Sequence, residues 1–277
     1  MFLLQGINSF GQTDTSAAAS DSAVSTDQQE NDFQSGLDTM FQSSYSIRDT
    51  FGWDTLHVSA KHFDSQNWKD TARLVLADSA AGMYYCQPFC NFITSDFGFR
   101  RWGWHYGVDV RLLKGDTVRS ALNGTVRLIG YDRRGYGHVV VVRHMSGLET
   151  LYGHLSKVSV TQNQKIIAGE PIGLGGSTGH STGSHLHFEM RFYGEPLNPN
   201  DIVDFTKCRL KSDTLVLTKA NFEYLVDLRK AKYTYVRKGD TLGHIARRYH
   251  TTVTKLCQLN HIKPTTILSI GRKLRYQ

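Results

Sequence analysis

The chain has 277 residues, of which 40% are hydrophobic and 21% are charged. This length allows two domains, one of them with a sizeable core, and the absence of any apolar run near 18 residues excludes a typical membrane-spanning helix. The formal net charge of +7 is uneven, because residues 207–277 hold 16 Lys and Arg against 4 Asp and Glu. Such a basic end favours a polyanionic partner, although a solvated basic surface would show the same charge.

The first 50 residues predict a disordered tether or a signal remnant. The stretch Met1–Ile7 is apolar but short and lacks a basic n-region, so it is not a complete secretory signal. It could be the tail of a longer signal, and this stretch alone leaves a cytosolic location open. Residues 9–49 are rich in Ser, Asp, Gln, Thr and Ala, a composition typical of a spacer. Order is expected from residue 51, and Ala72–Ala77 predicts a strand within an N-terminal extension at 51–91.

Residues 92–206 predict a domain built almost entirely of β-strands. Runs rich in β-branched residues alternate with turns that contain Gly and Asn, which indicates an antiparallel, partly curled sheet. No helix of ten residues or more is expected there. The predicted strands are 125–129, 138–144, 149–155, 165–167, 171–174 and 185–191.

From residue 207 the pattern changes. Residues 207–231 predict a linker that is part strand and part helix, and residues 232–277 predict a small βααβ unit. The fold class is therefore mostly β, with an antiparallel-sheet domain followed by a small α+β module. The unit contains a strand at 233–236, a helix capped by Asp240 or Thr241 that ends near Tyr249, a helix capped at Thr251 or Thr252 that ends near Leu259, and a strand at 273–276.

Two histidines on one predicted strand, His185 and His187, give the first indication of chemistry. Side chains two residues apart on a strand lie on the same face, so these imidazoles meet while Leu186 turns into the packing. Imidazole is a good zinc ligand and a usable general base. His105 and Asp109, four residues apart, offer a further imidazole and a carboxylate.

Two histidines and one carboxylate form a three-ligand zinc site with an open fourth position, which is typical of catalytic zinc. Zinc in such a site activates a water molecule and polarises a carbonyl, and spare histidines can then act as a base and as a partner for the developing charge. Residues 175–179 match the Gly-x-Ser-x-Gly motif by letter, but no helix follows them. The sequence therefore favours a metal over a serine nucleophile.

The stretch 95–204 resembles the LytM/lysostaphin-type zinc metallopeptidases of family M23. Three motifs occur in the family's order, and the Gly- and Ser-rich turns at 177–179 and 183–185 also fit. The resemblance implies an antiparallel-sheet peptidase domain at 92–206. The motifs are His105-x-x-x-Asp109, Tyr152-x-His154-Leu155 and His185-Leu186-His187.

The same resemblance implies a role for each motif residue. His105, Asp109 and His187 would bind one zinc ion per chain. His154 and His185 would be the catalytic pair, with His185 as the base for the attacking water and His154 stabilising the charged intermediate.

Residues around these motifs carry weaker predictions. His144 is expected to support the site, and His138 is expected to be structural. Tyr136 and Arg100 are expected to line the substrate cleft. Asn163 stands where the family usually has Gly, which affects only a turn because Asn tolerates positive φ.

The C-terminal unit, residues 232–277, resembles the LysM module, chiefly through the Gly-Asp-Thr-Leu core at 239–242 and the stretch 271–274. LysM modules bind glycans that contain N-acetylglucosamine in a shallow groove between two loops. Asp240 and Thr241 could cap a helix and contact glycan at once. The implied glycan-binding residues are Gly239, Asp240, Thr241, Leu242, Asn260 and Ile262.

Together these resemblances imply a peptidoglycan (murein) endopeptidase that is periplasmic or secreted and held on glycan by LysM. Its partners would be peptide stems and N-acetylglucosamine-containing glycan, and the basic end suits an acidic wall polymer better than nucleic acid. A D-Ala–diaminopimelate cross-link is the expected bond. The alternatives are a non-catalytic amidase activator and a glycan-binding scaffold whose cleft is covered by residues 51–91.

The four cysteines leave several pairings open. Cys86 and Cys90 could pair, either could meet Cys208, or all four including Cys257 could be buried thiols. A location in the cell envelope favours at least one disulfide.

Overall fold

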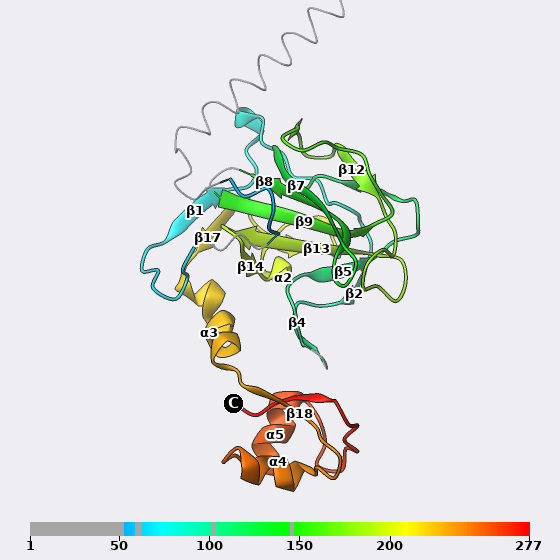
Figure 1. Ribbon diagram of the computed structural model, residues 1–277. Helices are drawn as coiled ribbons and strands as arrows, with labels where there is room; N and C mark the ends of the chain where they lie inside the picture. Colours follow the sequence, from blue (N-terminus) through cyan, green and yellow to red (C-terminus); the bar gives the residue numbers. More distant parts are fainter. Residues whose placement is uncertain (1–52, 59–62, 101–102, 145–146) are drawn as a thin grey trace, which may run out of the picture. The chain divides into compact units, whose positions relative to one another are not determined.

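The computed structural model describes residues 53–58, 63–100, 103–144 and 147–277, and the predicted tether at 1–50 lies outside them. The structure is mostly β, with antiparallel sheets followed by a small α+β unit, so the predicted fold class is confirmed (Figure 1). Within the described ranges, no helix combines the length and the apolar character needed to cross a membrane.

The largest sheet is antiparallel and has the strand order β11-β7-β8-β9-β13-β5-β2, with β14 paired to β13. The long strands β7, β8, β9 and β13 occupy its middle (Figure 1), where the sequence predicted strands from β-branched runs. The strands are β2 (Ile93–Ser95), β5 (Val108–Arg111), β7 (Gly124–Asp132), β8 (Gly137–Arg143), β9 (Leu148–Leu155), β11 (Lys165–Ile166), β13 (His185–Phe192) and β14 (Glu195–Leu197).

Smaller sheets and short helices complete this part of the chain. The sequence predicted no helix of ten residues or more in 92–206, and in the described part of that range the α-helix is α2, which is four residues long. The other elements are β1 (Ala72–Val75) paired with β17 (Thr214–Leu217), β3 (Gly98–Arg100) paired with β4 (Gly103–His105), β6 (Thr117–Arg119), β10 (Lys157–Val158) and β12 (Pro171–Leu174) in one sheet, β15 (Val203–Asp204) paired with β16 (Arg209–Leu210), and the helices η1 (Ser79–Ala81), α2 (Pro199–Ile202), η3 (Lys219–Phe222) and α3 (Glu223–Lys230).

The two faces of the large sheet differ in chemistry. Along β13, Leu186 and Phe188 belong to the main hydrophobic core. The alternating residues His187, Glu189 and Arg191 lie on the opposite face, although each is at most 6% exposed. That second face also carries a small apolar cluster of Leu128, Val139, Val141 and Leu151. The candidate site is built on this second, partly charged face.

The N-terminal extension and the segment after the sheet domain are joined, because β1 pairs with β17. Phe63 and Trp68 from the extension pack with Phe222, with ring centroids 5.2 to 6.1 Å apart. Residues 207–231 contain both strand and helix, as predicted, and Phe222 lies in the main core. The division into domains remains a prediction.

Of the pairings that the sequence left open, the structure contains Cys90–Cys208, with Cα atoms 5.6 Å apart. The bond links Cys90, three residues before β2, to the turn after β15, across 118 positions of sequence. Cys86 and Cys257 are free thiols.

The C-terminal unit has the predicted order of strand, helix, helix and strand around a core of its own. Thr241 caps the first helix by accepting from the His244 amide at 3.1 Å, and Thr252 caps the second by accepting from the Lys255 amide at 3.0 Å. The elements are β18 (Tyr233–Tyr235), α4 (Leu242–Arg248), α5 (Val253–Asn260) and β19 (Lys273–Arg275).

Candidate metal centre

Three side chains predicted as zinc ligands meet at one point on the charged face of the sheet. His105 ends β4, Asp109 lies in β5, and His187 lies opposite Asp109 in the β13–β5 register. His105 Nε2 is 2.9 Å from His187 Nδ1 and 3.0 Å from Asp109 Oδ1, and His187 Nδ1 is 2.9 Å from the same oxygen. All three residues are buried.

This donor set fits zinc. Zinc is bound by imidazole nitrogen and carboxylate oxygen at about 2.0–2.2 Å in a tetrahedron, which places ligand atoms about 3.4 Å apart. The three atoms found here are within about half an ångström of that spacing. The other nitrogen of His187, Nε2, lies 2.9 Å from Glu189 Oε1, and a carboxylate partner of this kind is usual for a metal-ligating histidine.

The same contacts also change how readily His187 and Asp109 bind a proton. Burial lowers the pKa of His187, but hydrogen bonds to Asp109 and Glu189 outweigh this and raise it to about 9. Burial likewise acts to raise the pKa of Asp109, yet the His105 and His187 side chains hold it far below its usual range. A metal therefore competes with a proton for Nδ1 of His187.

Arg100 and a backbone carbonyl both lie at the outer nitrogen of His105. Nδ1 is 2.8 Å from the Asp96 carbonyl, which can only accept, and it also contacts the Arg100 guanidinium, which can only donate. A metal on Nε2 requires the proton on Nδ1, so it selects the hydrogen bond to Asp96. Arg100 then retains its bond to Asp109 Oδ2 at 2.9 Å.

The predicted catalytic pair, His154 and His185, lies beside these three residues, with the two rings 4.6 Å apart. Nδ1 of His154 donates to the Thr178 carbonyl and Nδ1 of His185 donates to the Gly183 carbonyl, each at 2.8 Å. In the neutral form of each ring this donation leaves the lone pair on Nε2, and Nε2 of His185 lies 3.6 Å from Asp109 Oδ1. Burial lowers the pKa of His154 to about 4, so this ring is neutral near pH 7.

Tyr136 lies close to the site, with its ring centroid 5.5 Å from that of His187, and its expected place in a substrate cleft stays a prediction. Its hydroxyl donates to Glu189 Oε1 at 2.9 Å, and its carbonyl accepts from the His154 amide at 2.7 Å. His154 itself has a φ of 62°, an unusual value that this hydrogen bond helps to hold.

Sequence reasoning missed Glu189 and Arg191. Burial acts to raise the pKa of Glu189, but Arg191 and His187 outweigh it and hold the pKa at about 2. The available signal was the strand period, because residues 187, 189 and 191 fall on one face.

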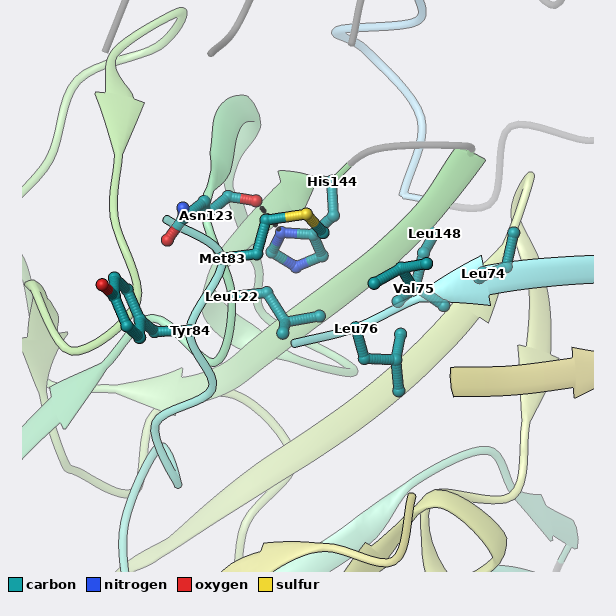
Figure 2. Close-up of a pocket in the computed structure, with 9 residues that line it drawn as sticks. All are labelled: Leu74, Val75, Leu76, Met83, Tyr84, Leu122, Asn123, His144 and Leu148. Atoms are coloured by element: carbon teal, nitrogen blue, oxygen red, sulfur yellow. Dashed lines mark hydrogen bonds between the residues drawn. The ribbon is translucent and has the colours of Figure 1, made fainter. Parts of the chain in front are cut away.

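The expectation that His144 supports the site was wrong. β8 and β9 are antiparallel with His138 opposite Leu155, so it is the His138 end of β8 that lies near the site. Figure 2 shows the His144 imidazole in a pocket among Met83 and Leu122. Its Nδ1 donates to the Asn123 carbonyl at 2.9 Å.

Two of the smaller predictions concern local packing. The His138 amide donates to Thr178 Oγ1 at 3.0 Å, and its ring centroid lies 4.7 Å from that of Tyr131, in keeping with a structural role. Asn163 has a φ of 66°, the left-handed conformation that Gly would also adopt.

Residues 53–58 reach the face of the sheet that carries the site. The buried Arg127 guanidinium donates to the carbonyls of Asp54, His57 at 3.0 Å and Val58 at 3.1 Å. Val58 and Tyr136 pack against the same small apolar cluster. This part of the extension thus lies near the site, whereas 51–52 and 59–62 lie outside the described residues.

The predicted glycan-binding residues occupy two loops of the C-terminal unit. Gly239 to Leu242 lie before and at the start of α4, where Asp240 forms an ion pair with Arg248 at 2.5 Å. Asn260 ends α5, and its buried amide bonds to the backbone of Leu256 and Arg275. Leu242 and Ile262, one from each loop, pack in the same core.

Two stretches of the chain match models of known protein families. Residues 103–199 match the model of peptidase family M23, and residues 235–276 match that of the LysM domain. The DD-carboxypeptidase/endopeptidase Mpg of Neisseria meningitidis is 44% identical over 113 residues, which are 39% of this chain and 26% of the relative. The murein hydrolase activator NlpD of Escherichia coli is 34% identical over 97 residues, 35% of this chain and 25% of the relative.

The matched region is thus about a quarter of the length of these curated relatives. Among solved structures, a zinc-containing peptidase from Vibrio cholerae is 30% identical, with 46% of this chain and 41% of that chain covered and a TM-score of 0.39. By its sequence matches, this chain carries a domain of peptidase family M23 followed by a LysM domain.

Proposed function

We propose that the protein is a zinc-dependent endopeptidase that cleaves peptide bonds in peptidoglycan. The observation that carries the proposal is the convergence of His105 Nε2, Asp109 Oδ1 and His187 Nδ1 within 3.0 Å. The Neisseria relative is named an endopeptidase, and a D-Ala–diaminopimelate cross-link remains the bond we expect. The site of action would be the periplasm or the cell exterior, because peptidoglycan lies there.

In this proposal, bound zinc supplies Lewis-acid chemistry at the open coordination position. His185 Nε2 would accept the proton of the attacking water, since its Nδ1 is held by the Gly183 carbonyl. His154 would stabilise the negative charge that develops on the substrate oxygen. Because burial keeps His154 neutral near pH 7, its one ring proton would have to move from Nδ1 to Nε2 for the ring to donate to that oxygen.

A non-catalytic role is the alternative, and the similarity to NlpD, a murein hydrolase activator, favours it. A degenerate domain would lack part of the metal-binding set, whereas all three predicted ligands and both spare histidines meet here. A covered cleft is the third possibility, supported by the position of residues 53–58 beside Tyr136. We favour the enzyme because the five side chains form a complete set.

The test is digestion of purified peptidoglycan by wild type, His187→Ala and His185→Ala, with bound zinc quantified and products identified by mass. We expect wild type to release uncross-linked stems, His187→Ala to lose zinc and activity, and His185→Ala to keep zinc but lose activity. Wild type that binds zinc yet cuts nothing would favour the covered cleft. Wild type without zinc or activity would favour the activator.

The LysM domain would hold the enzyme on its substrate. We propose that the loops at 239–242 and 260–262 bind glycan that contains N-acetylglucosamine, aided by the basic charge of residues 207–277. Tethering raises the local substrate concentration, so modest affinity suffices. Co-sedimentation with peptidoglycan should be reduced by N-acetylglucosamine oligomers, and binding that responds only to salt would refute this assignment.

A further inference from the structure

The two candidate zinc histidines are oriented by different kinds of groups. The outer nitrogen of His105 faces the Asp96 backbone carbonyl, which substitution of a side chain cannot remove. The outer nitrogen of His187 faces a side chain, Glu189, at 2.9 Å. Glu189 is fully buried, so water cannot replace it as the partner of His187.

Glu189 is itself fixed by two neighbours. Arg191 Nε donates to Glu189 Oε2 at 2.5 Å, and Tyr136 donates its hydroxyl proton to Oε1 at 2.9 Å. Arg191 also donates to the Tyr136 hydroxyl oxygen at 3.1 Å, which closes a ring of three side chains. Glu189 and Arg191 are buried, with Arg191 2% exposed, and Tyr136 is half-buried. Because Arg191 can only donate and the Glu189 carboxylate can only accept, the hydrogen bonds of the ring have a fixed direction.

We propose that Glu189 is a positioning residue, which holds His187 in the tautomer and orientation that present Nδ1 to zinc, and that Arg191 and Tyr136 hold Glu189 in place. The inference rests on the proposed function, since it assumes that zinc binds at His105, Asp109 and His187. Tyr136 also bonds through its carbonyl to the His154 amide. The same ring therefore connects the metal side of the site to the catalytic histidine.

Replacement of Glu189 by Gln exposes this role, because neither orientation of the amide satisfies all partners. With its oxygen toward His187, the NH2 group meets the Arg191 Nε–H, and two donors face each other. With its oxygen toward Arg191, the NH2 group faces His187 Nε2 and favours the tautomer with a proton on Nδ1. That proton would stand where zinc must bind.

A matched control exists on the neighbouring strand. Glu149 in β9 is also fully buried on the same face and accepts from Arg127 at 2.5 Å and Arg143 at 2.8 Å. Within the described residues it has no hydrogen bond or ion pair to His105, Asp109 or His187. Glu149→Gln therefore disturbs a buried ion pair of the same type without touching the candidate zinc ligands.

The experiment measures the zinc dissociation constant of the full chain by competition with a chromogenic chelator, together with the melting temperature of each metal-free protein. We expect Glu189→Gln to weaken zinc binding 10- to 100-fold, and Glu149→Gln to change it by less than about threefold while lowering the melting temperature comparably. Glu189→Asp keeps a carboxylate and should recover part of the affinity.

If wild type binds zinc, two outcomes would overturn the proposal. One is an unchanged dissociation constant in Glu189→Gln, and the other is an equal loss of affinity in Glu149→Gln, which would mark a general effect of buried charge. Failure of wild type itself to bind zinc would overturn the proposed function, and this inference with it.

Discussion

The buried imidazole of His144 should make the protein less stable as the pH falls. Its Nδ1 donates to the Asn123 carbonyl, and its Nε2 accepts from the Thr150 hydroxyl at 2.7 Å. Thr150 in turn bonds to the Tyr152 hydroxyl at 2.8 Å. A proton on Nε2 would turn an acceptor into a donor inside this closed chain.

The size of the effect follows from the pKa. Burial lowers the pKa of His144 from 6.5 to about 4, with Arg143 opposing and Glu149 favouring the charged form to smaller extents. Because the unfolded chain binds this proton more readily, stability is lost as the pH falls from above 6.5 toward 4. The loss attributable to His144 is about 1 kcal/mol at pH 5.5 and about 2–3 kcal/mol at pH 4.5, and it levels off at about 3–4 kcal/mol.

Urea unfolding of wild type and His144→Gln at pH 7.5, 6.5, 5.5 and 4.5 measures this difference. The test uses only how the difference in free energy of unfolding between wild type and the variant changes with pH. Any destabilisation by the substitution that does not depend on pH therefore cancels. We expect wild type to lose stability relative to His144→Gln by the amounts above, and His180→Gln, at an exposed position, to parallel wild type. A wild-type-to-variant difference that stays within about 0.5 kcal/mol over this range would refute the reasoning.

Two further changes test the packing of the β-rich part of the chain. Reduction of the Cys90–Cys208 disulfide, which closes 118 positions of sequence, should lower the free energy of unfolding by up to about 5 kcal/mol. The control Cys86→Ser should lower it by less than about 1 kcal/mol. A loss below about 1 kcal/mol on reduction of the disulfide would contradict this prediction. Gly137→Ala adds a Cβ 2.3 Å from Thr178 Oγ1 at a φ of +64°, so it should lower both the melting temperature and hydrolysis, since Thr178 holds His154. Gly130→Ala, with contacts of 3.4 Å or more, should change neither, and equal behaviour of the two variants would argue against this.

The strands could be predicted because they depend on local pattern, whereas the five candidate site residues follow from the resemblance to the motifs of family M23, and their roles stay predictions. β13 follows from alternation around His185 and His187, and the same alternation brings His187 opposite Asp109 once β13 and β5 pair. The helix caps Thr241 and Thr252 are likewise local. Local pattern could not predict that Cys208 pairs with Cys90, because this pairing depends on how residues far apart in the chain meet.

The position of His144 failed for a different reason. Strand periodicity alone does not say which end of β8 lies beside the part of β9 that carries His154. Only the register, with Arg143 opposite Glu149 and His138 opposite Leu155, shows which end of β8 reaches the site. The pattern of residues along β8 is the same whichever end lies near the site, so periodicity cannot distinguish the two arrangements.

The charged face of the sheet explains why Glu189 escaped prediction and why it matters. Alternation along a strand indicates a polar face turned to water, yet Arg127, Glu149 and Glu189 are completely buried. Buried charges remain stable only when each has a partner, and removal of one partner typically costs about 3–5 kcal/mol. A face built in this way holds each side chain in one orientation. That rigidity is what the proposed metal site requires, and at Glu189, which bonds to His187, the stability of the sheet and the proposed affinity for zinc would depend on the same hydrogen bonds.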